Sequence, residues 1–219
     1  ASRAADLYGM LEGNAMECAD ADAAYTQSYL DAKNPTWVRI PKEQWPEEWI
    51  GKYKDPVCPL VLSLYGHPES GAHWEKHCES ELLKVGWTPI PGWRSCFWHH
   101  ECESLLVVYV DDFKLAGPKK HIKRLWKDMR GDAEHPENGG IYMGEPSEIK
   151  RFLGCHHNVV EATDPVSGKK VRRMEYDMES FFTDALSRYC KLTNQSIESL
   201  PTASTPFLDE AVLRKNHNV

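Results

Sequence analysis

The chain has 219 residues, of which 41% are hydrophobic and 27% charged, enough for the core of one substantial domain or of two small lobes. No apolar run approaches the roughly 20 residues of a membrane span and no signal peptide opens the sequence, so we expect no membrane partner. The net charge of −7 counts mildly against a nucleic-acid binder, and seven scattered cysteines are typical of reduced, intracellular thiols, in the cytoplasm or nucleus.

The first part of the sequence predicts a helix, a strand, an irregular connection and a second helix. Residues 3–12 have the apolar content of a short helix, and residues 15–25 (AMECADADAAY) predict a strand of small residues. Five prolines and three tryptophans make residues 34–59 an irregular connection. A helix over 68–86 begins at a proline, ends at a glycine and has one apolar face.

The next part predicts strands followed by a helix and a loop. Residues 93–117 read as two or three strands. Residues 118–130 predict a helix, because apolar residues recur at helical spacing between a proline and a glycine. Residues 131–148 are rich in Gly, Pro and Glu, which favours a long loop.

The last part predicts a hairpin, a helix and an extended tail. Two strand-like segments flank the turn residues 164–168. Apolar residues between 178 and 189 follow helical spacing, and the segment from Pro201 onward is expected to be extended or loosely ordered.

The most apolar run, LLVVYVDDFKLAG at 105–117, contains two adjacent carboxylates. We predict two antiparallel strands, Leu105–Val110 and Phe113–Ala116, with Asp111 and Asp112 at the tip of the hairpin. Two neighbouring carboxylates repel each other, and a divalent cation is their natural partner. Mg²⁺ held by carboxylates and phosphates is the chemistry of two-metal phosphoryl transfer. The alternative is a surface hairpin that uses Asp-Asp as its turn.

This run resembles the Tyr-x-Asp-Asp hairpin of reverse transcriptases, in the form typical of copia-type retrotransposons (Leu-x-Val-Tyr-Val-Asp-Asp). Four other blocks resemble that family in the same order: DADAAYTQSYL, LSLYGHPESGAHWEKH, EIKRFLG and STP. The resemblance covers about residues 15–206. It implies a polymerase palm that joins deoxynucleotides to a primer on an RNA or DNA template, using two Mg²⁺ ions, with Mn²⁺ as a substitute.

The resemblance also implies roles for individual residues. Asp20, Asp111 and Asp112 would be the catalytic, metal-binding carboxylates, with Asp22 as the rival of Asp20. The nucleotide-binding residues would be Ala21 (through its carbonyl), Tyr25, Tyr65, Gly66 and Glu69. A ring at Tyr25 would exclude a 2′-hydroxyl and so select deoxynucleotides, whereas the alternative is a core aromatic.

Two further groups would contact the nucleic acid. The strand carrying Phe152, Leu153 and Gly154 would position the primer end, although ordinary strand packing explains Phe152 and Leu153 as well. The exposed basic row of the second helix would contact the phosphate backbone, the alternative being a solvated face: Lys119, Lys120, Lys123, Arg124 and Lys127.

Two departures from the family favour a second function. Glu69 stands where the family has a glutamine, and its charge would weaken triphosphate binding. We also expect the fingers to be largely missing at the N-terminus. The alternative is therefore a truncated or domesticated palm that binds nucleic acid or acts as a scaffold without polymerising. Zinc held by the Cys and His residues at 96–102 and 155–157 matches no standard spacing.

The expected fold is α+β: a palm with an antiparallel sheet backed by helices. We divide the chain into a palm core with partial fingers elements (1–130), the rest of the palm with the primer-positioning hairpin and a connecting helix (131–206), and a tail (207–219). The remainder of a polyprotein is an expected partner, and the sequence leaves the oligomeric state open.

Overall fold

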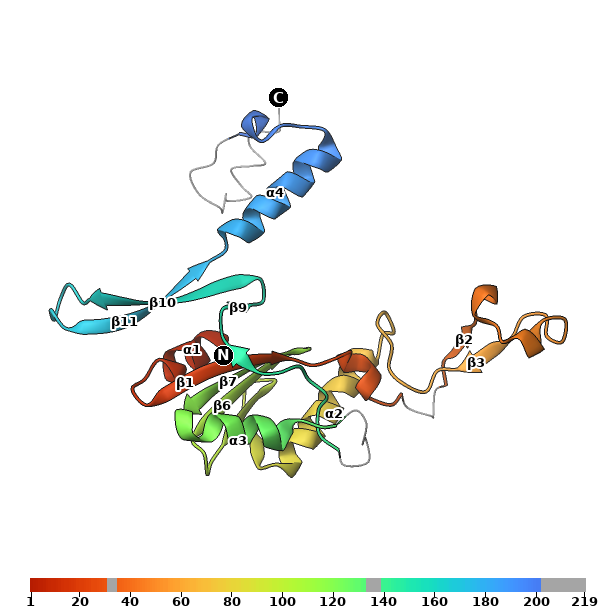
Figure 1. The fold of residues 1–219 in the computed structure, drawn as a ribbon, viewed down its shortest axis with the longest axis horizontal. Coiled ribbons are helices and arrows are strands. Elements are labelled where there is room, and N and C mark those ends of the chain that lie inside the picture. Colours follow the sequence, from red (N-terminus) through yellow and green to blue (C-terminus); the bar gives the residue numbers. More distant parts are fainter. Residues whose placement is uncertain (31–34, 133–138, 202–219) are drawn as a thin grey trace. The chain divides into compact units, whose positions relative to one another are not determined.

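The computed structural model describes residues 1–30, 35–132 and 139–201 (Figure 1). The fold is α+β, with antiparallel sheets and four α-helices in the described ranges. It divides into two compact units, Ala1–Glu175 and Tyr176–Val219. The division falls inside the predicted 131–206 segment. None of the helices in the described ranges is both long enough and apolar enough to cross a membrane.

The main sheet has six strands in the order β4-β5-β6-β7-β1-β8. Its strands are β1 (Asn14–Asp20), β4 (Trp87–Pro89), β5 (Cys96–His99), β6 (Ser104–Tyr109), β7 (Asp112–Pro118) and β8 (Ser147–Glu148). Every pairing between neighbours is antiparallel. Because β7 lies between β6 and β1, the sheet brings the N-terminal strand beside the predicted hairpin.

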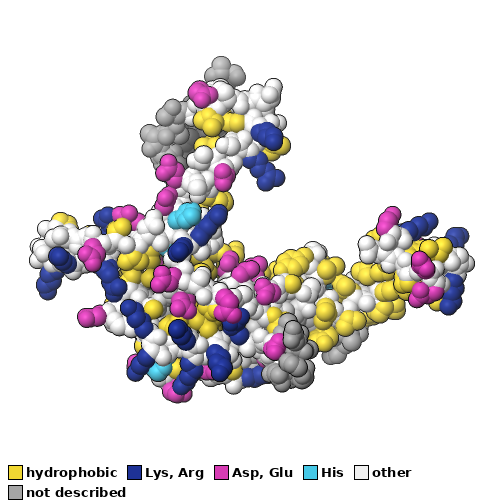
Figure 2. Space-filling view, in the orientation of Figure 1, with side chains coloured by type: hydrophobic (Ala, Val, Ile, Leu, Met, Phe, Trp, Pro, Cys, Tyr) yellow, Lys and Arg dark blue, Asp and Glu magenta, His cyan; other side chains and the backbone are white. Residues whose placement is uncertain are grey.

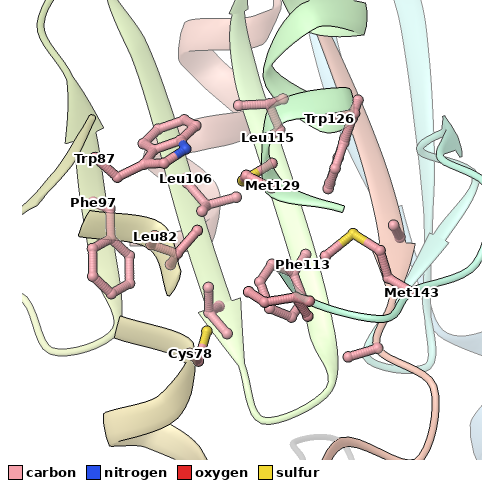
Figure 3. Close-up of a cluster of buried hydrophobic side chains, with 14 of the residues drawn as sticks. Cys78, Leu82, Trp87, Phe97, Leu106, Phe113, Leu115, Trp126, Met129 and Met143 are labelled. Carbon is pink, nitrogen blue, oxygen red and sulfur yellow. The ribbon is translucent and has the colours of Figure 1, made fainter. Parts of the chain in front are cut away.

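One face of this sheet is covered by α2 (Ser70–Lys84) and α3 (Lys119–Met129). Side chains alternate between the faces of a strand, so Phe113 and Leu115 of β7 point into the same core as Leu106 and Val108 of β6. Figure 3 shows Phe113, Leu115, Trp126 and Met129 directed toward one another in this core. The predicted helices over 68–86 and 118–130 are thereby confirmed.

The opposite face carries α1 (Ser2–Gly9), which confirms the predicted first helix. Ala5 of α1 packs against Leu105 and Val107 of β6 and Ala116 of β7. Lys114 of β7 lies on this face too, because it alternates with Phe113 and Leu115. The sheet is therefore covered on both faces in its middle.

Between β1 and α2 the chain makes an excursion away from the sheet. It leaves after the 3₁₀ helix Ala24–Gln27 and returns at Ser63, whose N–H donates to the Ser28 carbonyl at 2.8 Å. The excursion contains the paired strands β2 (Trp37–Arg39) and β3 (Val57–Pro59). We expected an irregular connection here, and the pair was missed because three-residue strands give too little alternation to recognise.

The C-terminal part contains a second sheet and a helix. Strands β9 (Arg151–Phe152), β10 (Cys155–Thr163) and β11 (Lys170–Asp177) lie in the order β11-β10-β9, and α4 (Glu179–Thr193) follows. The predicted hairpin around 164–168 and the fourth helix are confirmed. The predicted loop at 131–148 contains the short strand β8, while residues 133–138 and the tail from 202 lie outside the described residues.

Candidate functional site

The hairpin in the main sheet turns one residue earlier than the sequence indicated. Tyr109 pairs with Asp112, so the two turn residues are Val110 and Asp111, and Asp112 is the first residue of β7. The prediction that Asp111 and Asp112 together form the tip was therefore wrong. Val110 has a φ of 57°, which suits the first position of a tight hairpin turn but is unfavourable for a β-branched side chain.

Trp74 of α2 fixes this turn from the core side. Its indole N–H donates to the Val110 carbonyl at 2.7 Å. This bond satisfies a carbonyl that the turn leaves without a ladder partner. The apolar stripe of the predicted helix includes Trp74, but nothing in that stripe indicates a hydrogen bond to the hairpin.

The register of the sheet sets Asp20 directly opposite Asp112. Tyr109 and Asp112 close a two-residue turn, so the Asp112 backbone groups face β6 and its pairing with Asp20 is of the non-hydrogen-bonded kind. In such pairs the Cα atoms are about 4.5 Å apart and the side chains share one face. Two aspartates far apart in sequence are thus near neighbours.

A backbone hydrogen bond from Ala21 holds Asp111 beside the Asp20–Asp112 pair. The Ala21 N–H donates to the Asp111 carbonyl at 2.7 Å, which continues the ladder past the last paired residues. On its other side, the Asp20 carbonyl accepts from Gly144 N–H at 3.0 Å. The end of β1 is therefore fixed between the hairpin turn and the segment that follows residue 140.

The carboxylates influence one another's pKa. Burial raises the pKa of Asp20 above its usual 3.8, and the charges of Asp111 and Asp22 raise it further. Burial, followed by the charges of Asp111 and Asp20, likewise raises the pKa of Asp112. The three predicted residues therefore form one electrostatic group.

Asp22, the rival of Asp20, lies beyond the end of β1. Its N–H donates to the Tyr142 carbonyl at 2.9 Å, and its own carbonyl accepts from the Gln27 side chain at 2.7 Å. Asp20, in contrast, is a strand residue with a partner on β7. The geometry therefore favours Asp20 as the residue that acts with Asp112.

The chemistry of these donors fits a hard divalent cation, because carboxylate oxygens are the ligands that Mg²⁺ takes. Mutual repulsion between the carboxylates also favours a positive charge between them. Within the described ranges, no three or more His, Cys, Asp or Glu side chains are gathered around one point in the manner of a metal site. The fit therefore rests on donor type and strand register.

Two tyrosines lie beside the carboxylates. Tyr25, on the 3₁₀ helix after β1, has its ring centroid 4.6 Å from that of Tyr65. Burial raises the pKa of Tyr65, and the charges of Asp111 and Asp20 add to that rise. Tyr65 therefore lies close to both Tyr25 and the carboxylates, and the nucleotide-binding roles of the two tyrosines stay predictions.

Gly66 and Glu69 form the turn that leads into α2. Gly66 has a φ of 93°, which favours glycine, and Glu69 occupies the position before the first helical residue. The Glu69 N–H donates to His67 Nδ1 at 3.2 Å, and its side chain is exposed.

The predicted primer-positioning residues form a second tight turn. Leu153 and Gly154, with φ of 50° and 76°, connect β9 to β10, and Phe152 pairs with Cys155 across the turn. Two positive φ values are typical of a type I′ turn. Phe152 is buried, in agreement with the packing alternative, whereas Leu153 is exposed.

The basic row lies on the outer surface of α3. All five side chains are exposed, and Figure 2 shows Lys and Arg gathered with acidic side chains over this part of the molecule. Arg124 pairs with Glu101 at 3.3 Å and with Asp128 at 3.5 Å. Because α3 packs on the face that holds Phe113 and Leu115, the row is on the opposite face of the sheet from Asp20 and Asp112.

A cavity of about 550 Å³ opens between α2 and the hairpin. Its lining includes Tyr25, Trp74, Tyr109 and Val110. No local sequence pattern indicates this cavity, because its walls come from four separate segments: Tyr25, residues 71–78, residues 94–97 and residues 108–110.

The Cys and His clusters are occupied by local hydrogen bonds. His99 Nδ1 accepts from the Cys102 N–H at 3.2 Å, and His157 Nδ1 lies 3.0 Å from the Cys155 carbonyl. These contacts give no support to a shared zinc ion.

No protein-family model matches the chain, and a search of curated proteins finds no match either.

Proposed function

We propose that this chain carries the palm of an RNA-directed DNA polymerase of the copia retrotransposon type, which extends a primer on an RNA or DNA template. The observation that carries the proposal is the pairing of Asp20 with Asp112, beside Asp111, at one end of an antiparallel sheet. The five sequence blocks in family order support it.

In this proposal Asp20, Asp111 and Asp112 hold two Mg²⁺ ions, or Mn²⁺ in their place. Bound there, the ions would supply neutralisation of phosphate charge and activation of the primer 3′-hydroxyl. The protein groups contribute position: Trp74 fixes the turn that bears Asp111, and the Ala21 N–H fixes its carbonyl.

Tyr25 and Tyr65 would contact the incoming deoxynucleoside triphosphate. Their rings support each other at 4.6 Å, so the Tyr25 ring has little freedom to move aside for a 2′-hydroxyl. Leu153 and Gly154, at the exposed turn of β9 and β10, would contact the primer end. The α3 basic row would reach nucleic acid only on the far face of the sheet.

The function is tested by primer extension with Asp111→Asn. The substitution removes a charge without changing the size of the side chain, and we expect extension to fall by at least about a thousandfold. Asp128→Asn, the same change on the opposite face of the sheet, is the matched control and should extend primers like the wild type. Survival of extension in Asp111→Asn would disprove the assignment of Asp111.

A non-polymerising palm that binds nucleic acid or other polyprotein segments is the second candidate. Glu69 favours it, because an exposed carboxylate stands there in place of the family's glutamine, and its negative charge would repel a triphosphate. Cation and primer binding by a wild-type chain that extends no primer would select this alternative.

A further inference from the structure

A lysine is fully buried two residues after Asp112, on the same face of β7. The side chain of Lys114 has no exposed surface, while its neighbours Phe113 and Leu115 point into the opposite core. A buried ammonium is costly unless each of its N–H groups has an acceptor. The partners of Lys114 therefore indicate why a charge is kept at this position.

The three N–H donors of the ammonium meet three acceptors. Lys114 Nζ lies 2.7 Å from Ser2 Oγ, 2.7 Å from Asp6 Oδ1 and 3.3 Å from His157 Nε2. Because His157 Nδ1 lies 3.0 Å from the Cys155 carbonyl, we assign the ring proton to Nδ1, so that Nε2 accepts from Lys114. Every acceptor comes from outside the main sheet.

The ammonium also contacts the aromatic ring of β9. Lys114 Nζ lies 4.3 Å from the centroid of the Phe152 ring, and the same ring meets His157 edge-on. Phe152 directly precedes the Leu153–Gly154 turn, and His157 follows it by three residues. The two strands that flank the turn, β9 and β10, are therefore each in contact with the Lys114 side chain.

Burial lowers the pKa of Lys114, whereas the bond to Asp6 opposes that shift. A leucine or isoleucine at this position would pack against α1 without this cost. Packing alone therefore does not explain a lysine at this position. Unlike leucine or isoleucine, Lys114 makes hydrogen bonds to two other elements, α1 and β10.

We propose that Lys114 is a positioning residue for the primer end: it joins the Leu153–Gly154 turn and α1 to β7, the strand that bears Asp112. That the turn contacts a primer end rests on the proposed function. That Lys114 joins the turn and α1 to β7 rests only on the contacts of Lys114, and we call this link the join. Residues 2, 6, 114, 152 and 157 all belong to the first compact unit.

The test compares the wild-type chain with Lys114→Met and with the double variant Lys114→Met, Asp6→Leu. The single variant leaves the Asp6 carboxylate buried without the ammonium, so we expect it to be strongly destabilised. The double variant removes both charges, a change that folded proteins often tolerate. Leu115→Ala is the control, because it weakens the opposite core and leaves the Lys114 contacts in place.

Two quantities are measured: hydrogen exchange of the 151–157 amides, and the separate KM values for primer–template and deoxynucleotide. We expect the double variant to exchange about tenfold faster over 151–157 and to show a KM for primer–template raised about tenfold, with the nucleotide KM within about twofold. Leu115→Ala should change neither selectively.

Unchanged exchange over 151–157 in the double variant would overturn the join. Faster exchange with no rise in the primer KM would overturn the role in primer positioning. If the wild-type chain extends no primer, the proposed function fails, whereas faster exchange in the double variant would still support the join made by Lys114.

Discussion

Asp20 and Asp112 are placed where two negative charges face each other across neighbouring strands. Like charges in directly opposite positions destabilise a sheet, by an amount of about 0.2 to 1 kcal/mol. Because the pair destabilises the sheet, we expect it to have a functional role, and the role we propose is shared binding of a cation. The cost should be measurable in the absence of a divalent cation.

Asp112→Asn should therefore stabilise the chain in a buffer that contains a chelator. We expect the free energy of unfolding at pH 7 to rise by about 0.2 to 1 kcal/mol, which raises Tm by up to about 4 °C. Thermal unfolding followed by circular dichroism measures the change. A lower Tm would show that the Asp112 carboxylate makes favourable contacts that outweigh the repulsion.

The stability gained by Asp112→Asn should depend on pH. The pKa of Asp112 is raised above 3.8 in the folded chain, so the folded state binds this proton more tightly than the unfolded state. The carboxyl therefore contributes its full stability below pH 3.8, and loses it as the pH rises through the higher folded pKa. The advantage of Asp112→Asn should be largest at neutral pH and vanish as the pH falls below 3.8.

At the scale of the element, the hairpin holds a residue in an unfavourable backbone conformation. Val110 has a φ of 57°, where the β-branched side chain crowds its own backbone, and the Trp74 indole holds its carbonyl. Strain of this kind persists only where the surroundings determine the conformation. The hydrogen bond from Trp74 and the pairing of β6 with β7 are those surroundings.

Val110→Gly should relieve this strain. Glycine adopts positive φ without a steric cost, so we expect the free energy of unfolding to rise by about 1 kcal/mol, measured by urea denaturation. Val107→Ala, a truncation on β6 just before the turn at a residue with ordinary backbone geometry, should instead destabilise the chain. Loss of stability in Val110→Gly would mean that the valine side chain contributes more than its backbone costs.

The elements with strong periodicity could be predicted from sequence. The helices in the described ranges and the apolar hairpin follow from their apolar content and spacing, and for α2 and α3 also from the Pro and Gly residues that flank them. The turn position could not, because Asp-Asp and Val-Asp both suit a two-residue loop and only the pairing of Tyr109 with Asp112 decides between them. Short strands such as β2 and β8 carry too few residues to show a pattern.

The candidate site was predicted through the order of the sequence blocks, and its contacts were not. Nothing local to Asp20 indicates that it faces Asp112, since the pairing depends on the position of β1 beside β7. Lys114 was overlooked because a lysine in an apolar strand gives no sign of its partners. Asp6 and His157, which bind it, are far away in sequence.

At the scale of the whole molecule, the residues proposed for catalysis lie at one end of the main sheet, within the first compact unit. β1 supplies Asp20, the hairpin supplies Asp111 and Asp112, and the segment leading to α2 supplies Tyr65. The basic row of α3 lies on the opposite face, so any nucleic acid held there is separated from the carboxylates by the sheet. Substitutions in the basic row should therefore affect nucleic-acid binding on that face, and substitutions of the carboxylates should affect primer extension.

The central claim is that Asp20 and the hairpin carboxylates bind one set of cations, and titration with Mn²⁺ followed by electron paramagnetic resonance tests it most directly. We predict that Asp20→Asn and Asp112→Asn each weaken Mn²⁺ binding about tenfold or more, because each removes a ligand of the same site. Asp22→Asn, which changes the neighbouring carboxyl beyond the strand, should bind Mn²⁺ nearly as the wild type does. If Asp20→Asn bound Mn²⁺ like the wild type while Asp112→Asn lost it, the two aspartates would not share a site and the account would be contradicted.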